Sequence, residues 1–266
     1  MGVVEIQYFI GIDIGSTATK AVALTPAGTI LGSKVVSSGA GTHADEEALH
    51  LLRQECHLLP ENCGCLVATG YGRLICREAD MQMSEISCHA KGIHHLLPET
   101  RTIIDIGGQD LKVIRINERG SVQQFMMNDK CAAGTGRFLE VMSQVLKIPL
   151  SELGTLDQKS IHIEPVSSTC TVFAESEVIS KLASGAEIPN IIAGIHDSVA
   201  RKVVGLAMRI GVEPQVALTG GVALNQGVIR ALERNLKQHI MTADIPQLTG
   251  ALGAALIGLE KKNNFE

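Results

Sequence analysis

The chain has 266 residues, of which 45% are hydrophobic, and its formal net charge is −5. This length buries a large core in one or two domains, and the negative charge argues against a nucleic-acid-binding surface. Aromatic residues make up only 3% and tryptophan is absent, so we expect no stacking platform for single-stranded nucleic acid.

Export and membrane segments are not evident. There is no uncharged apolar run of about 18 residues, and the N-terminus lacks a basic region before an apolar stretch. Seven cysteines, an odd number without an export signal, argue against a disulfide framework. We therefore expect a cytoplasmic protein with reduced thiols, and metal binding by some of these thiols is the alternative to test.

The first predicted elements are two strands around a short loop. An apolar run at residues 8–12 leads into Asp13, and residues 21–24 form the second strand. Glycine lets backbone approach a ligand closely, and successive N–H groups and hydroxyls in such a loop bind anions. A carboxylate at the strand end holds Mg²⁺ or its waters. The candidate phosphate-binding residues here are Ser16, Thr17, Ala18, Thr19 and Lys20.

Up to residue 100 the pattern predicts three strands over residues 6–37, then a helix, a short strand and a second helix. The helices are expected over residues 45–59 and 84–97, from their apolar spacing and the prolines that follow them. The strand is expected at residues 66–68. We take residues 1–100 as an N-terminal lobe.

The loop motif recurs 92 residues later, where residues 104–112 align with residues 12–20. Asp105 matches Asp13, Gly107 matches Gly15 and Lys112 matches Lys20. Internal repetition is a stronger signal than a single motif. Two facing copies would place two carboxylates and two glycine loops around one polyphosphate. This arrangement resembles the phosphate loops of the actin, sugar-kinase and heat-shock ATPase superfamily. The second copy adds Gly107, Gly108 and Gln109 as candidates.

The second half, residues 101–266, is predicted to be mainly helical after the repeated strands. The apolar face of the helix at 171–182 is expected to contain Phe173, Val178, Ile179 and Leu182. The other expected elements are helices at 134–146, 188–210, 228–236 and 249–259 and a strand at 216–218.

Paired glycines, Gly220 and Gly221, follow the strand at 216–218 and precede a helix. Such a turn lets backbone meet a phosphate or a flat ligand at a helix N-terminus. Asn225 and Gln247 are candidates near the nucleotide, and a helix cap or a surface amide explains them equally well. No Walker A or Rossmann glycine motif occurs in the context that either requires.

Two of the seven cysteines, Cys131 and Cys170, each precede a predicted helix. Helix N-termini favour anions and thiolates, which suits a metal or an iron–sulfur cluster. An isolated cysteine is more often a small buried hydrophobe, so position alone leaves ligation open. Cys63 and Cys65 have no answering pair at zinc spacing, and the remaining cysteines are expected in the core.

Several segments together resemble the activator (component A) family of (R)-2-hydroxyglutaryl-CoA dehydratase, with the related ATPase subunits of benzoyl-CoA reductase. They are residues 13–17, 68–73, 82–90, 104–110, 128–140, 167–180 and 219–221. The resemblance runs from about Phe9 to Leu259, and the two cysteine segments are its most specific part.

The resemblance implies a duplicated α/β fold of the actin-like, ribonuclease H-like type, with ATP or ADP in a cleft between two lobes. It also implies a homodimer in which one [4Fe–4S] cluster is held by Cys131 and Cys170 of both chains. ATP hydrolysis would then inject one low-potential electron into an acyl-CoA dehydratase or reductase, with reduced ferredoxin or flavodoxin as the donor. Asp13 and Asp105 are the expected catalytic residues on the Mg²⁺ side, and Gln109 is a weaker candidate for aligning the attacking water.

Two other functions stay open at this point. A small-molecule kinase of the same superfamily would need a catalytic base and a substrate-binding lobe, for which 266 residues leave little room. A nucleotide-dependent binding module without turnover is the second alternative.

Overall fold

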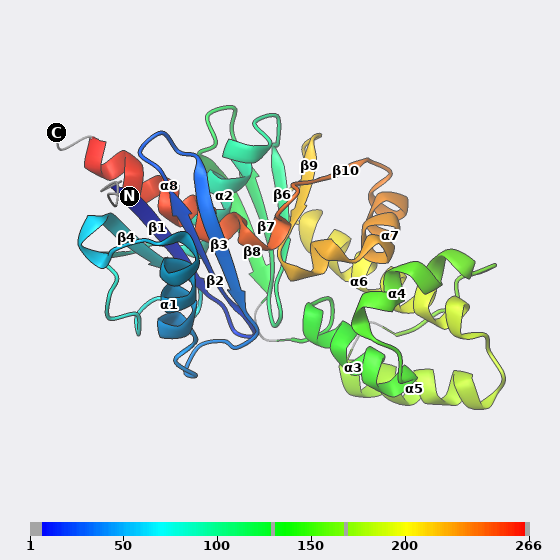
Figure 1. Cartoon of the computed structure of the whole chain (residues 1–266). Helices are drawn as coiled ribbons and strands as arrows, with labels where there is room; N and C mark the ends of the chain where they lie inside the picture. Colours follow the sequence, from blue (N-terminus) through cyan, green and yellow to red (C-terminus); the bar gives the residue numbers. More distant parts are fainter. Residues whose placement is uncertain (1–6, 129–130, 168–169, 264–266) are drawn as a thin grey trace. The chain divides into compact units, whose positions relative to one another are not determined.

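The computed structural model describes residues 7–128, 131–167 and 170–263, which form two compact units (Figure 1). Among these residues the first unit holds the chain up to Glu99, Asn117–Val122 and the chain from Gln247 on. The second unit holds Thr100–Ile116 and Gln123–Pro246. The predicted ranges 1–100 and 101–266 differ from these units chiefly because the C-terminal helix belongs to the first one.

The first unit is built on a five-stranded sheet of order β3-β2-β1-β4-β5. Strands β1, β2 and β3 are antiparallel neighbours, whereas β4 and β5 run parallel to β1. The strands are β1 (Tyr8–Ile14), β2 (Thr19–Leu24), β3 (Ile30–Val36), β4 (Cys63–Thr69) and β5 (Met81–Gln82).

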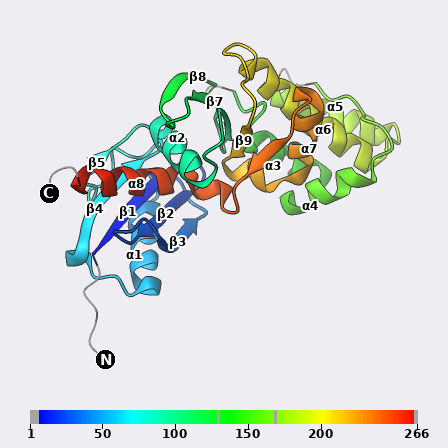
Figure 2. The same cartoon turned by 90° about the horizontal axis from the view of Figure 1, so that it is seen from above.

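Helices cover both faces of this sheet, with α1 (Ala44–Cys56) and α8 (Thr249–Asn263) on opposite sides of β1 (Figure 2). Successive strand residues face opposite sides, and Ile10 and Ile12 accordingly lie in one apolar cluster with α1. On the other face, a Cβ at Gly11 would lie 1.9 Å from the carbonyl oxygen of Ala251. Helix α8 therefore packs directly on the backbone of β1, beside α2 (Glu85–Leu96).

The second unit has a sheet of order β10-β9-β6-β7-β8 and one large apolar core. Ile104 of the sheet shares this core with Phe138, Val199 and Leu232 of three helices. The strands are β6 (Thr102–Ile106), β7 (Leu111–Ile116), β8 (Val122–Asn128), β9 (Val216–Thr219) and β10 (Ile240–Thr242). The helices are α3 (Gly136–Leu146), α4 (Leu150–Leu156), α5 (Thr171–Ala183), α6 (Ile188–Ala207) and α7 (Gln226–Leu236).

Strand register confirms the predicted duplication. Asp13 of β1 lies opposite Lys20 of β2, and Asp105 of β6 lies opposite Lys112 of β7. The parallel neighbours match as well, because Asp13 pairs with Thr69 of β4 and Asp105 pairs with Thr219 of β9. Each unit therefore presents an aspartate, a lysine and a threonine at the same end of its sheet.

The prediction for the apolar face of α5 was wrong in two positions. Ala174 and Val178, one helical turn apart, are buried in the core, but Phe173 is 68% exposed and Ile179 is 52% exposed. The inward stripe of α5 consists of Ala174, Val178 and the partly buried Leu182, so the prediction was right for Val178 and Leu182 and too wide by Phe173 and Ile179. Among the described residues, no helix is long and apolar enough to cross a membrane.

Candidate nucleotide and cysteine sites

The first hairpin ends at a buried carboxylate with one unused oxygen. Asp13 is 3% exposed, and its Oδ2 accepts from Lys20 Nζ at 3.4 Å. Its Oδ1 is buried and makes no hydrogen bond within the described chain. A buried oxygen without a partner costs free energy, so this atom suits a cation or a cation-bound water.

The loop that follows Asp13 is shaped by its backbone. Gly15 N–H donates to the carbonyl of Ala18 at 3.0 Å, and Gly15 C=O accepts from Ala40 N–H at 2.9 Å. The hydroxyl of the buried Thr19 donates to the carbonyl of Ser38 at 3.0 Å, so Thr19 stabilises the conformation of the loop.

Ser16 and Thr17 are the polar side chains that remain available in this loop. Both are partly exposed, and neither hydroxyl makes a hydrogen bond to the described residues. Together with Lys20, whose side chain is 16% exposed, these two hydroxyls can bind a phosphate.

The second hairpin repeats this turn with a different lysine environment. Gly107 N–H donates to the carbonyl of Asp110 at 3.0 Å, just as Gly15 does to Ala18. Lys112 is 1% exposed, and its Nζ lies 3.1 Å from Asp105 Oδ2 and 2.7 Å from Asp110 Oδ2. The lysine is thus held between two carboxylates.

Helix α3 is attached to the second loop through its first turn. Gly136 N–H donates to Gly107 C=O at 2.9 Å, and Arg137 N–H donates to Gly108 C=O at 2.8 Å. These bonds satisfy helix N–H groups that otherwise have no intrahelical partner. Gln109, at the tip of the same loop, is exposed.

One glycine stands beside each aspartate, and in both cases only glycine fits. Gly70 has a φ of +84°, and a Cβ there would lie 2.4 Å from Asp13 Oδ1. Gly220 has a φ of +86°, and its Cβ would lie 2.4 Å from Ile106 O and 2.7 Å from Asp105 Oδ1. Gly221 is different, because a Cβ there would meet open space.

Asn225 is the N-cap of α7, which confirms the cap interpretation of this residue. Its Oδ1 accepts from Gly227 N–H at 2.9 Å, while its Nδ2 lies 3.2 Å from His196 Nε2. His196 Nδ1 lies 2.8 Å from Asp157 Oδ2. Gln247 lies at the centre of the short helix Pro246–Leu248 and is partly buried.

Burial and hydrogen bonding determine the protonation states of His196 and Asp157. Burial lowers the pKa of His196 despite the neighbouring Asp157. Burial opposes ionisation of Asp157, but hydrogen bonds from His196 and Arg230 lower its pKa overall. A neutral His196 with its proton on Nδ1 donates to Asp157 and accepts from Asn225, which orients the amide for capping.

The two candidate cluster cysteines sit in different local settings. Cys170 is the N-cap of α5, as predicted, and its carbonyl accepts from Ala174 N–H at 3.0 Å. Cys131 does not open α3, because the turn of residues 132–135 intervenes before Gly136. Thr135 closes this turn by donating its hydroxyl to Ala132 C=O at 2.7 Å. Residues 129–130 and 168–169 of the two motifs lie outside the described residues.

The thiols of the other five cysteines have raised pKa values and therefore ionise poorly. Burial raises the pKa of Cys63 and of Cys76 to about 11 and that of Cys88 to about 12. Burial also raises the pKa of Cys56 and of Cys65. Metal ligation requires a thiolate, so these five are unfavourable ligands.

Sequence reasoning missed three features of these sites. Asp110 was not predicted as a partner of Lys112, and Gly70 was not predicted as the counterpart of Gly220. The repeat carried both signals, since Lys112 aligns with Lys20 and each glycine follows a strand-ending threonine. The pairing of His196 with Asp157 had no signal in the sequence, because it joins residues 39 positions apart.

Comparisons with known proteins find relatives over nearly the whole chain. The model of the BadF/BadG/BcrA/BcrD ATPase family matches residues 10–258. The chain is 51% identical over 255 residues to the 2-hydroxyisocaproyl-CoA dehydratase activator of Clostridioides difficile, covering 96% of each. It is 49% identical to the (R)-2-hydroxyglutaryl-CoA dehydratase activating ATPase of Acidaminococcus fermentans, covering 96% of this chain and 98% of that protein.

Solved structures confirm the predicted fold class. The activator of the 2-hydroxyisocaproyl-CoA dehydratase from Clostridium difficile with bound ADPNP superposes with a TM-score of 0.94 at 50% identity, covering 97% of each chain. A ROK family glucokinase from Streptomyces griseus gives a TM-score of 0.57 at 14% identity over 94% of this chain and 98% of that one, which shows a shared fold alone.

Proposed function

The chain belongs to the BadF/BadG/BcrA/BcrD ATPase family, and we propose that it hydrolyses ATP to drive transfer of a single electron to an acyl-CoA dehydratase or a related cluster-containing enzyme. The observation that carries this proposal is identity of about half the residues, over nearly the whole chain, to dehydratase-activating ATPases. The duplicated aspartate hairpins supply the residues that such an activity needs.

The first hairpin provides the main phosphate contacts in this proposal. Residues Ser16 to Lys20 bind the polyphosphate through N–H groups, the hydroxyls of Ser16 and Thr17, and the lysine. Asp13 Oδ1, buried and without a hydrogen bond in the described chain, binds Mg²⁺ or one of its waters. This unsatisfied oxygen is the structural feature that fits a cation.

The second hairpin and the glycine turn supply further residues for the nucleotide in this proposal. Gly107 and Gly108 bring backbone N–H groups to the phosphates, Asp105 lies on the Mg²⁺ side, and Gln109 orients the attacking water. Phosphoryl transfer depends mainly on such positioning and charge placement. Gly220 and Gly221 hold the adenosine, with Asn225 and Gln247 nearby. Open space beside Gly221 supports an approach of the ligand there.

Cys131 and Cys170 would hold the iron–sulfur cluster. Both thiols are partly exposed, whereas burial raises the pKa of the other five cysteines. Four thiolates are the usual ligand set, so two chains related by two-fold symmetry would share one [4Fe–4S] cluster. When bound, a cluster of this type exchanges one electron at low potential.

Exposed apolar side chains support the proposed homodimer. Val172 and Phe173 follow Cys170 directly and are 67% and 68% exposed. Large apolar side chains beside a proposed intersubunit ligand are expected at a surface that a second copy covers. Reduced ferredoxin or flavodoxin is the proposed electron donor.

A continuous set of hydrogen bonds leads from the second loop toward Cys131. Gly107 and Gly108 accept from the start of α3, and Thr135 at that start donates to Ala132, next to Cys131. A nucleotide that shifts this loop would therefore shift the cysteine segment. We propose this path as the coupling between hydrolysis and electron transfer.

A small-molecule kinase remains the alternative but is not favoured. The similarity to sugar kinases is limited to the fold, whereas the close relatives are named as activators of dehydratases. Formation of a phosphorylated small molecule together with ADP would support the kinase.

Anaerobic purification of cysteine variants tests the proposal. The unaltered protein should be brown and oxygen-sensitive, contain about four irons per two chains, hydrolyse ATP and activate a dehydratase. Cys131→Ser and Cys170→Ser should lose the iron, while the matched controls Cys63→Ser and Cys65→Ser should keep it. Full iron retention in the Cys170 variant, or four irons on a monomer, would contradict the ligand assignment.

A further inference from the structure

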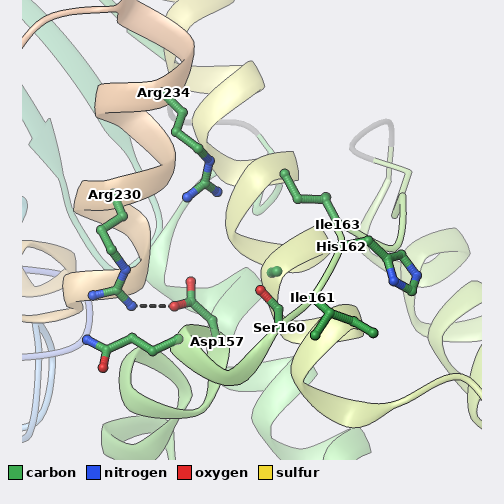
Figure 3. Close-up of a pocket in the computed structure, with 9 residues that line it drawn as sticks. Asp157, Ser160, Ile161, His162, Ile163, Arg230 and Arg234 are labelled. Carbon is green, nitrogen blue, oxygen red and sulfur yellow. Dashed lines mark hydrogen bonds and ion pairs between the residues drawn. The ribbon is translucent and has the colours of Figure 1, made fainter.

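A pocket in the second unit is lined by none of the residues proposed above to bind the nucleotide or the cluster. It has a volume of about 400 Å³, within the usual size of small-molecule sites. Its polar wall contains Arg230 and Arg234 of α7, with Asp157 and Ser160 facing them (Figure 3). Its apolar wall contains Ile161, Ile163 and Ala193.

One arginine of this pocket is held in place by the protein. Arg230 Nη2 donates to Gly154 C=O at 2.5 Å and forms an ion pair with Asp157. Asp157 is itself oriented by His196 Nδ1 at 2.8 Å. The Arg230 guanidinium is thus a fixed part of the pocket wall, and its charge is already paired with Asp157.

The second arginine, Arg234, has no partner among the described residues. Arg234 is exposed, and within the described chain it makes neither a hydrogen bond nor an ion pair. Its guanidinium points toward the space between Asp157 and Ser160 (Figure 3). The Ser160 hydroxyl makes no hydrogen bond to the described residues either, so two donors face one cavity.

The charge count favours a monoanion. Asp157 neutralises Arg230, which leaves the single positive charge of Arg234. A carboxylate matches both this charge and the planar fork of an arginine. A phosphate carries nearly two negative charges at neutral pH, which is more than the single positive charge of Arg234 balances.

The apolar wall indicates the rest of the ligand. Ile161 is 82% exposed and Ile163 is 40% exposed, although both are large aliphatic side chains. Their loop is fixed from behind, because Asn190 Oδ1 accepts from Ile161 N–H at 2.9 Å. We propose that this pocket binds a short aliphatic carboxylate, with its carboxylate on Arg234 and Ser160 and its hydrocarbon chain against Ile161 and Ile163.

The test uses the anaerobically prepared full chain saturated with ADP and Mg²⁺, so that the nucleotide site is already filled. Acetate, butyrate and hexanoate are titrated at constant ionic strength, with calorimetry or ligand-observed NMR as the readout. Affinity should rise from acetate to hexanoate. Arg234→Ala should weaken hexanoate binding by roughly tenfold or more, as expected for loss of a charged hydrogen bond.

Matched variants separate the site from general charge effects. Arg209→Ala removes another exposed arginine of the same unit and should leave binding unchanged. Ile161→Ser should weaken the dependence on chain length, and ATP turnover should be unaltered in all three variants. Absence of saturable binding, equal affinity in the Arg234 variant, or phosphate binding more tightly than hexanoate would overturn the assignment.

Discussion

The two aspartate hairpins share a register but hold their lysines differently. Lys112 lies between Asp105 and Asp110 and is 1% exposed. Of the carboxylates in the described residues, Lys20 pairs with Asp13 alone, at 3.4 Å, and its side chain is 16% exposed. The sequence difference behind this is one residue, because the position of Asp110 is occupied by Ala18 in the first hairpin.

This difference indicates two roles for the lysines of the duplicated motif: Lys112 stabilises its loop, and Lys20 is available to a ligand. A lysine fixed by two carboxylates holds its loop together but has little freedom to reach a phosphate. A lysine with one long contact can move to a ligand at small cost. We infer that the first hairpin carries the mobile cation and that the second supplies a rigid backbone.

The largest expected effect is on the stability of the second unit. Lys112→Met removes the buried cation between Asp105 and Asp110 and should cost about 3–5 kcal/mol of unfolding free energy. Lys20→Met should cost about 1 kcal/mol or less, because its pair is partly exposed, yet it should strongly reduce ATP turnover. Urea denaturation and ATPase assays of the two variants measure these effects. Equal destabilisation by Lys112→Met and Lys20→Met would contradict the different roles of the two lysines.

Turnover should depend on both aspartates. Asp13→Asn and Asp105→Asn should each lower ATP hydrolysis on the order of 10²–10³-fold, as when a charge-positioning group is lost. Asp13→Asn should also raise the Mg²⁺ concentration required, since Oδ1 is the open ligand atom. Exposed Asp244 provides the control, as Asp244→Asn should change neither quantity. Normal turnover in either variant would refute its catalytic assignment.

The glycines beside the two aspartates should respond alike. Gly70→Ala and Gly220→Ala place a Cβ at positive φ within 2.4 Å of an oxygen, so each should destabilise its unit on the order of 1–3 kcal/mol. Gly221→Ala meets open space and should keep the stability while weakening nucleotide binding. Thermal unfolding with ADP titration measures these effects. Unfolding of the Gly221 variant would show a structural role instead.

The smallest effect on stability should come from giving the first hairpin the second carboxylate that the second hairpin has. Ala18→Asp places a second carboxylate near Lys20 and should change stability by about 1 kcal/mol or less. It should lower turnover by restraining the lysine. Ala18→Asn is the neutral control, because asparagine has the size and shape of aspartate without its charge. Undiminished turnover in the aspartate variant would show that mobility of Lys20 is not required.

Much of the fold was predictable because the strands have strong local signals. Apolar runs ending in aspartate and glycine located β1 and β6, and their similarity revealed the repeat. The pairing of Asp13 with Lys20 and of Asp105 with Lys112 follows once the two strands form a hairpin.

Features that depend on distant packing were not predictable. Phe173 is apolar but exposed, because the side of α5 that enters the core is chosen by α3 and α6. The distance of Cys131 from α3 depends on the turn closed by Thr135. The bond between His196 and Asp157 forms only after α6 and the end of α4 have packed together.

The attachment of α3 to the second loop also fixes the directions of two peptide groups. In a trans peptide the C=O and the following N–H point in opposite directions. Because Gly107 C=O and Gly108 C=O both point at α3, the N–H groups of Gly108 and Gln109 point away from it. Any tilt of α3 therefore rotates two donors together. By thermodynamic reciprocity, a phosphate that selects one orientation of these donors must favour one position of α3 by the same free energy. We expect ADP affinity to change when iron is removed, and by the same factor that ADP changes the affinity for iron.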